Sequence, residues 1–141
     1  MAFDPVSAYP LGQKRPKAVT TPSGLPLDNV TLEGMREGRL AWEDLRATSE
    51  TLRRQAAVAE AVGRTALAEN LERAAELATI PSDTILEIYT ALRPHRSSKD
   101  ELEAWAAKLD EEGAPTSAAF VREASQVYAR RGLLAGDRGR V

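Results

Sequence analysis

The chain has no cysteine and a single histidine, His95, among its 141 residues. Without cysteine it can form no disulfide framework, no thiolate metal site and no cysteine nucleophile, and a cytoplasmic location fits best. Aromatic residues are also scarce, at 5 % of the sequence. Alanine fills many of the apolar positions instead, and each alanine buries little area. We therefore expect a fold that gains stability from an external partner.

Long apolar runs and a strong net charge are missing as well. No stretch approaches the roughly 20 apolar residues that cross a bilayer. The start, MAFDPVSAYP, lacks the charged head and apolar core of a secretory signal. The formal net charge of −2 argues against a general nucleic-acid binder, which presents a basic face to phosphates. We expect neither a membrane nor a nucleic acid as partner.

Proline is concentrated at the start of the chain. Prolines remove backbone donors and favour extended neighbours, and five of them fall in the first thirty residues: Pro5, Pro10, Pro16, Pro22 and Pro26. We predict an extended arm over residues 1–30 with no persistent helix. The arm has more apolar residues, Tyr9 among them, than a free linker needs. We therefore expect it to lie along a surface of this or another subunit.

From Thr31 onward, apolar residues recur at helical spacing. Thr31 is the expected N-cap of one or two short helices. A longer helix is predicted from Thr48 or Ser49 to Gly63, followed by an antiparallel partner that ends before Pro81. The positions expected on the buried faces of this pair are Leu52, Ala56, Ala59, Leu67, Leu71, Ala74, Ala75 and Ala78.

Three more helices are predicted in the second half of the chain. Ser82 is the expected cap of a short apolar helix that ends before Pro94. Ser98 and Glu101 form a capping box for the next helix, which runs to Gly113. The last helix is predicted in TSAAFVREASQVYARRG and ends at Gly132. The residues expected to be buried on these helices are Ile85, Ile88, Tyr89, Leu92, Leu102, Trp105, Ala106, Leu109, Phe120, Ala124, Val127 and Tyr128.

No segment alternates with the period of two that a half-buried strand requires. The predicted fold class is therefore all-α, with about five to six helices and an extended Pro-rich N-terminal arm. The expected organisation is an arm over residues 1–30, a helical domain over 31–134 and a frayed tail over 135–141.

His95 lies between two arginines in the sequence LRPHRSS, directly before the capping box. A lone imidazole can act as a general base or metal ligand. It has no second histidine or cysteine beside it, and the nearby Asp100 and Glu101 are committed to capping. Arg93, Arg96 and Ser97 could instead hold an anion at the following helix N-terminus. The simpler interpretation is a capped turn whose arginines pair with carboxylates nearby or across an interface.

Other candidate chemistry is weaker. The acidic sequence LDEEG ends a helix, where consecutive carboxylates point in different directions and favour a solvated surface. No GxxxxGK[ST] or strand-preceded GxGxxG is present, so nucleotide binding is not supported. Trp105 lies within an apolar stripe, which favours core or interface packing over stacking on a ligand.

A family resemblance extends this interpretation. The successive segments SAYPLGQKRP, LPLDNVTLEGM, DLRATSETLRRQAAVAEAVGR and ENLERAAELATIPSDTILEIYTALRPHRSS, followed by AAFVREASQVYARRGLL, closely resemble the small subunit of adenosylcobalamin-dependent diol and glycerol dehydratases. The resemblance runs from about Ser7 to Leu134. His95 departs from the family pattern, in which tyrosine commonly stands between LRP and RSS, and an exchangeable ring weakens an acid/base role.

The resemblance implies a small, non-catalytic structural subunit that braces the large catalytic subunit of a propanediol/glycerol dehydratase, a hydro-lyase. It implies large and medium subunits as partners, assembled as a dimer of heterotrimers. Adenosylcobalamin would bind to those subunits and not to this chain, which lacks the cobalamin-binding motif DxHxxG. No catalytic, cofactor-binding or metal residue is carried over. The chain alone is predicted to be inactive.

Five residues are expected at the subunit interface: Tyr9, Tyr89, Arg93, Arg96 and Ser97. Some relatives begin with an added amphipathic helix that targets the enzyme to a bacterial microcompartment. Here SAYPL follows Met1 after a few residues, and no such helix is expected. The alternative function is a free helical adaptor, a protein-interaction module with no enzymatic role. The preference for propanediol or glycerol would be determined by other chains.

Overall fold

A computed structural model of the chain describes residues 3–137. The chain divides into two compact units between Ala78 and Thr79, here called the N-terminal unit and the C-terminal unit. The all-α prediction is confirmed: residues 3–137 hold eight α-helices and three short 3₁₀ helices, with no strand beyond an isolated bridge between Thr20 and Pro26.

The N-terminal unit begins with four short helical segments. These are α1 (Pro5–Ala8), α2 (Leu11–Lys14), and the 3₁₀ helices η1 (Pro16–Ala18) and η2 (Leu27–Asn29). The expectation of an arm without helix was therefore wrong in part. Proline is compatible with the first helical position, where its missing N–H has no intrahelical acceptor. Pro5 and Pro16 stand at the starts of α1 and η1.

Two further short segments follow, α3 (Leu32–Arg36) and η3 (Trp42–Leu45). Thr31 caps α3 as predicted, because its Oγ1 accepts the backbone N–H of Gly34 at 3.0 Å. The buried carboxylate of Asp44 accepts the N–H groups of Ala41 at 3.0 Å and Ser23 at 3.2 Å. These bonds join the arm to η3.

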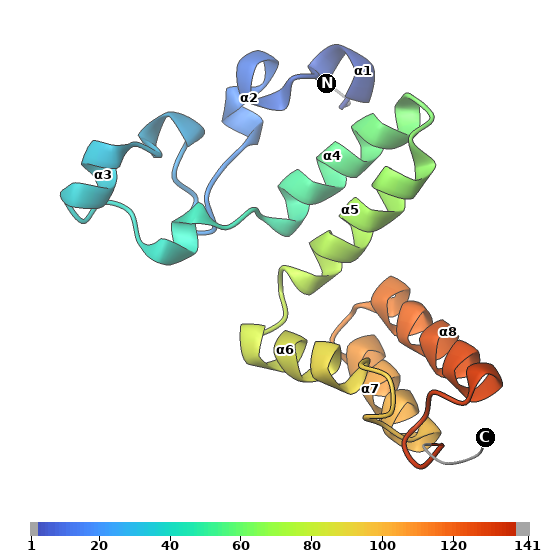
Figure 1. The fold of residues 1–141 in the computed structure, drawn as a ribbon. Coiled ribbons are helices and arrows are strands. Elements are labelled where there is room, and N and C mark those ends of the chain that lie inside the picture. The colour runs from blue at the N-terminus through green and yellow to red at the C-terminus, as the bar shows by residue number, and fades with distance from the viewer. Residues whose placement is uncertain (1–2, 138–141) are drawn as a thin grey trace. The chain divides into compact units, whose positions relative to one another are not determined.

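Helices α4 (Ser49–Ala61) and α5 (Thr65–Leu77) lie side by side as an antiparallel hairpin (Figure 1). Thr48 caps α4, and Gly63 adopts a φ of 74°, a region that favours glycine and ends the helix sharply. The hairpin interior is filled by small side chains: Ala56, Ala59, Ala68 and Ala75. These let the two backbones approach closely, and they leave Leu67, which was expected to be buried, 44 % exposed.

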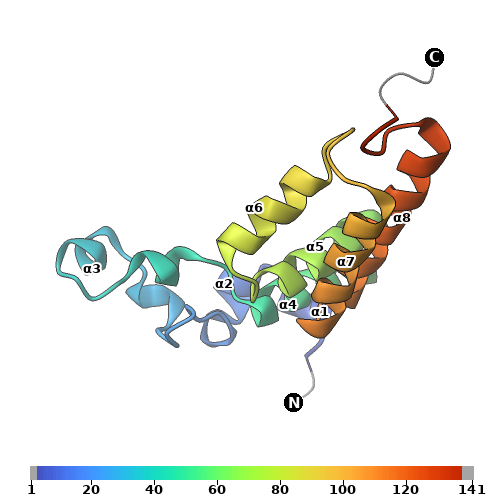
Figure 2. The ribbon, with the colours of Figure 1, turned by 90° about the horizontal axis from the view of Figure 1, so that it is seen from below.

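The C-terminal unit contains α6 (Ser82–Ala91), α7 (Lys99–Glu111) and α8 (Pro115–Arg131). Helices α7 and α8 lie side by side in both views, whereas α6 diverges from them (Figures 1 and 2). The predicted capping box is confirmed, with Ser98 Oγ accepting the Glu101 N–H at 3.2 Å and the Glu101 carboxylate accepting the Ser98 N–H at 2.7 Å. The core of this pair consists of Leu102, Ala106, Leu109, Ala114, Ala118 and Val121.

Three details of the C-terminal unit differ from the sequence prediction, and one is Tyr89, which was expected on the buried face of its helix but is 58 % exposed. Ser82 is the first residue of α6 and does not cap it, because Pro81 occupies the extended N-cap position and makes no side-chain bond to the helix. Phe120 was expected in the core but is 45 % exposed. The buried face of α8 instead carries Ala118, Val121 and Ser125, whose small size allows close packing. Residues 138–141 of the expected tail lie outside the described residues.

Candidate subunit interface

The turn from Arg93 to Ser98, here called the basic turn, connects α6 to α7. Its backbone is held by the chain after α8: the His95 N–H donates to the Leu133 carbonyl at 2.6 Å, and the Ala135 N–H donates to the Ser97 carbonyl at 2.9 Å. Two bonds between segments distant in sequence fix the conformation of the basic turn.

The C-terminal end of α6 is also closed by side chains. The last carbonyls of a helix have no intrahelical donor and need other partners. The Ser97 Oγ donates to the Ala91 carbonyl at 3.0 Å, and the Tyr128 hydroxyl donates to the Leu92 carbonyl at 2.5 Å. Ser97 is 8 % exposed, so its hydroxyl serves the basic turn itself. Its role as an interface residue stays a prediction.

The other predicted residues of this region face outward. Tyr89 is 58 % exposed, and Leu86, one turn earlier on α6, is 63 % exposed. Arg93 and Arg96 are exposed as well, and neither forms an ion pair with any described residue. Leu86, Tyr89, Arg93 and Arg96 are here called the α6 patch. Arg96 and Leu86 also line a shallow hollow of about 370 Å³. The α6 patch therefore offers apolar area and two positive charges that form no ion pair among the described residues.

His95 is shaped by the fold of the turn. Its φ of 62° lies in the left-handed region, which histidine visits more readily than most residues with a Cβ. Its Nδ1 is buried without a hydrogen-bond partner in the described part of the protein. Acid/base work needs an imidazole that reaches a reacting group with a partner to orient it. Among the described residues, none bonds to Nδ1 of His95 to orient its ring.

The acidic end of α7 is engaged in packing between helices. Arg122 of α8 donates to Glu103 and to Asp110 of α7, at 2.8 Å in each case. The hydrogen bond that Arg122 donates to Glu103, followed by the one it donates to Asp110, raises the pKa of the Arg122 guanidinium. The LDEEG segment thus contributes Asp110 to a bridge between α7 and α8. Trp105 is partly buried, and the Lys108 Nζ lies 5.2 Å from its ring centre.

Tyr9, the remaining predicted residue, is 61 % exposed in the N-terminal unit. It lines a groove between the arm and the α4–α5 hairpin. The five predicted interface residues therefore fall into two groups, one on each unit.

Sequence reasoning missed two features of this surface. One feature of the sequence could have predicted the hydrogen bond from Tyr128 to Leu92, because a tyrosine on an apolar helix face needs a partner for its hydroxyl. No feature of the sequence predicts the groove beside Tyr9, because its walls come from segments far apart in the chain. Within residues 3–137, no three His, Asp or Glu side chains form a group that could hold a metal ion. None of the helices described is long and apolar enough to cross a bilayer.

Comparison with known proteins agrees with the resemblance seen in the sequence. The family model "Dehydratase small subunit" matches residues 5–135. Over 133 residues the chain is 50 % identical to the propanediol dehydratase small subunits of Citrobacter freundii and of Salmonella typhimurium (strain LT2). Each alignment covers 94 % of this chain and 77 % of the relative. The chain belongs to the dehydratase small subunit family.

Proposed function

We propose that this chain is the small, non-catalytic subunit of an adenosylcobalamin-dependent propanediol/glycerol dehydratase and that it braces the large catalytic subunit. Half of the residues are identical to those of two propanediol dehydratase small subunits over nearly the whole chain, and this observation carries the proposal. The expected assembly is a dimer of heterotrimers made of large, medium and small subunits.

The α6 patch supports a docking role. Arginine and tyrosine are the residue types most enriched among the side chains that dominate binding energy at interfaces. Here both arginines of the patch project from the basic turn, whose backbone is fixed by bonds to Leu133 and Ala135, and Tyr89 lies near the end of α6, just before the turn. A fixed backbone reduces the entropy lost on binding. We assign the α6 patch to contact with the large subunit.

The residues of this chain do not fit a cobalamin site. Adenosylcobalamin supplies radical chemistry to the enzymes that bind it. The lone imidazole, His95, lies in a turn between two positively charged side chains, and its Nδ1 is enclosed by its own fold. The chain lacks DxHxxG. We therefore assign cofactor and substrate binding to the large and medium subunits.

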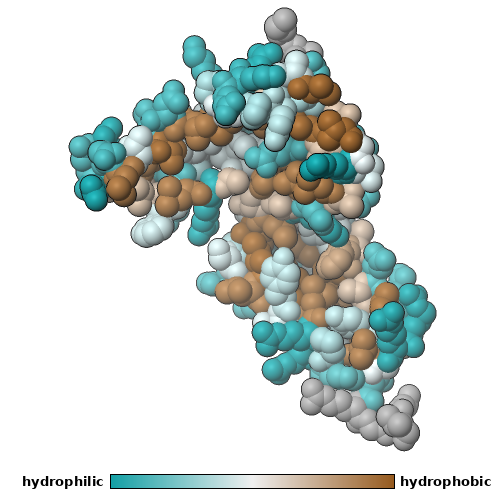
Figure 3. All heavy atoms as spheres, turned by 45° about the horizontal axis from the view of Figure 1, so that its top comes forward, coloured by the Kyte–Doolittle hydropathy of each residue, from teal (hydrophilic) through white to brown (hydrophobic). Residues whose placement is uncertain are grey.

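A bracing role has a simple thermodynamic form. A subunit that binds the folded state of its partner, and not the unfolded state, stabilises the partner by mass action. The exposed apolar residues of this chain, including Trp42 at 76 % exposure, supply area for such binding. Figure 3 shows that hydrophobic side chains reach the surface of both units on the face in view.

Co-purification tests the proposal. The tagged chain, co-expressed with the large and medium dehydratase subunits encoded in the same source, should bring down both. Native mass spectrometry should give two copies of each chain, and the assembled complex should dehydrate propanediol or glycerol. Assaying propanediol and glycerol separately would establish the preferred substrate.

Two results would contradict the proposal. One is a tagged chain that retains neither subunit under conditions in which all three are soluble. The other is a stable complex with different proteins that has no dehydratase activity, which would favour the free helical adaptor.

A further inference from the structure

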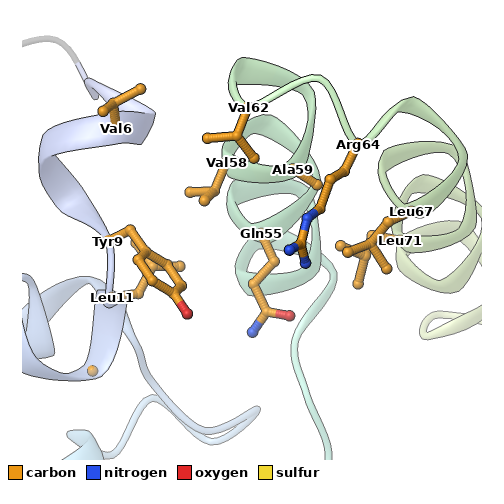
Figure 4. A pocket seen from close by; sticks show the side chains of 11 residues that line it. Val6, Tyr9, Leu11, Gln55, Val58, Ala59, Val62, Arg64, Leu67 and Leu71 are labelled. Carbon is orange, nitrogen blue, oxygen red and sulfur yellow. The ribbon is translucent and has the colours of Figure 1, made fainter.

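A groove of about 730 Å³ lies in the N-terminal unit between the arm and the α4–α5 hairpin. The arm contributes Val6 and Tyr9 to its wall, and α4 contributes Val58 and Val62. Figure 4 shows these side chains facing one another across the opening. Arg54 of α4 donates to the Ala18 carbonyl and so fastens the arm to the hairpin.

The chain does not fill this groove itself. Val6 is 59 % exposed, Tyr9 61 % and Val62 58 %, although all three are apolar or aromatic and line the same space. Sites for small molecules generally enclose 70–90 % or more of their ligand. Walls as exposed as these are more typical of a protein-binding surface, which buries its side chains only when the partner arrives.

The groove carries a positive charge at one position. Among the residues that the structure describes, Arg64 is the only charged one that lines the groove, and no acidic residue does. The side chain of Arg64 is exposed and forms no ion pair with any residue that the structure describes. Its backbone N–H donates to the Ala59 carbonyl at 2.9 Å, which fixes its position after Gly63. In Figure 4 the guanidinium of Arg64 points back into the space between α4 and α5.

We propose that this groove binds an apolar segment of the large dehydratase subunit that carries an Asp or Glu opposite Arg64. The proposal rests on the proposed function for the identity of the partner. Apolar side chains of the segment cover Val6, Tyr9 and Val62, and its carboxylate forms the ion pair that Arg64 lacks within this chain. A guanidinium suits this task because it can bind a carboxylate through two parallel hydrogen bonds.

The test uses the complex of all three subunits and four variants of this chain. Val62→Asp places a charge in the groove, and Arg64→Glu reverses the charge at its rim. The matched controls lie outside the groove: Leu32→Asp, at a leucine that is 61 % exposed, and Arg46→Glu, at an exposed arginine. Circular dichroism of each free variant establishes that its helices are retained.

The groove variants should weaken association with the large and medium subunits by about tenfold or more, and the controls by no more than about threefold. A photo-crosslinking benzoylphenylalanine in place of Val62 should label an apolar peptide of the large subunit that contains a carboxylate. Replacing that carboxylate with lysine should restore binding to the Arg64→Glu variant.

The outcomes separate this proposal from the proposed function. If the unaltered chain binds neither larger subunit, the proposed function fails and the groove assignment fails with it. If the unaltered chain binds but both groove variants bind equally well, the groove assignment alone fails. Crosslinking to a second copy of this chain, or to the medium subunit, also overturns the assignment of the groove to the large subunit.

Discussion

Replacing Tyr89 with alanine should separate the stability of the free chain from the stability of the complex. Tyr89 is 58 % exposed on α6, which leaves about 110 Å² of the 150–250 Å² that an aromatic side chain can bury. Covering that area in an interface would contribute about 3 kcal/mol at roughly 25 cal/mol per Å². Tyr89→Ala should therefore raise the Kd for the large subunit by about a hundredfold.

The free chain should respond differently. An exposed side chain contributes little to folding, so the free energy of unfolding should change by no more than about 0.5 kcal/mol. The Kd is measured by surface plasmon resonance or isothermal titration calorimetry, and the free energy of unfolding is measured by urea denaturation. Tyr89→Phe is the matched control, because it retains the ring and should bind within about threefold of the parent chain. A Kd for Tyr89→Ala within about threefold of the parent would place Tyr89 in solvent in the complex and refute the reasoning.

Three further substitutions test the fold and the site. Leu102→Ala should lower the free energy of unfolding by about 2–5 kcal/mol in urea denaturation, because it leaves a cavity at a fully buried position; a loss below 1 kcal/mol would contradict this packing. Hydrogen bonds from Ser23 and from the Ala41 backbone lower the pKa of Asp44 from 3.8 to about 2. The ionised carboxylate therefore stabilises the fold above pH 3.8, and this stabilisation is lost as the pH falls toward 2. The melting temperature of Asp44→Asn should thus be lower than that of the parent above pH 3.8, and the difference should close near pH 2. A difference in melting temperature that does not depend on pH would contradict the role of the charge. His95→Ala should keep the turnover of assembled enzyme within a few-fold, whereas losing a general acid or base costs about 10²- to 10⁴-fold.

Local signals accounted for much of the fold. The caps at Thr31, Thr48 and Ser98 were predictable because a capping side chain bonds to backbone groups two or three residues away. The end of α4 near Gly63 was predictable for the same reason, since a left-handed φ is a property of one residue. The helices themselves were predictable from these short-range features and from the helical spacing of apolar residues.

Features that depend on tertiary packing were predicted less well. Phe120 has the larger side chain, yet the α8 face that meets α7 carries Val121 and small residues, because close approach of two helices excludes a bulky ring. Tyr89 belongs to an apolar stripe by spacing, but α6 diverges from α7 and leaves it exposed. The groove joins residues from Val6 to Leu71, and no local pattern encodes such a meeting.

We propose that this chain supports assembly of a dehydratase and contributes no atom to its chemistry. The most direct test titrates the chain into purified large and medium subunits and measures turnover per assembled, cofactor-loaded complex. We expect the chain to increase the amount of assembled complex. Once assembly is complete, turnover per complex with Tyr89→Ala or His95→Ala should stay within a few-fold of the parent. A turnover per complex that falls by about 10²-fold or more with His95→Ala, in complexes shown to be intact, would place this chain in the active site and contradict the account.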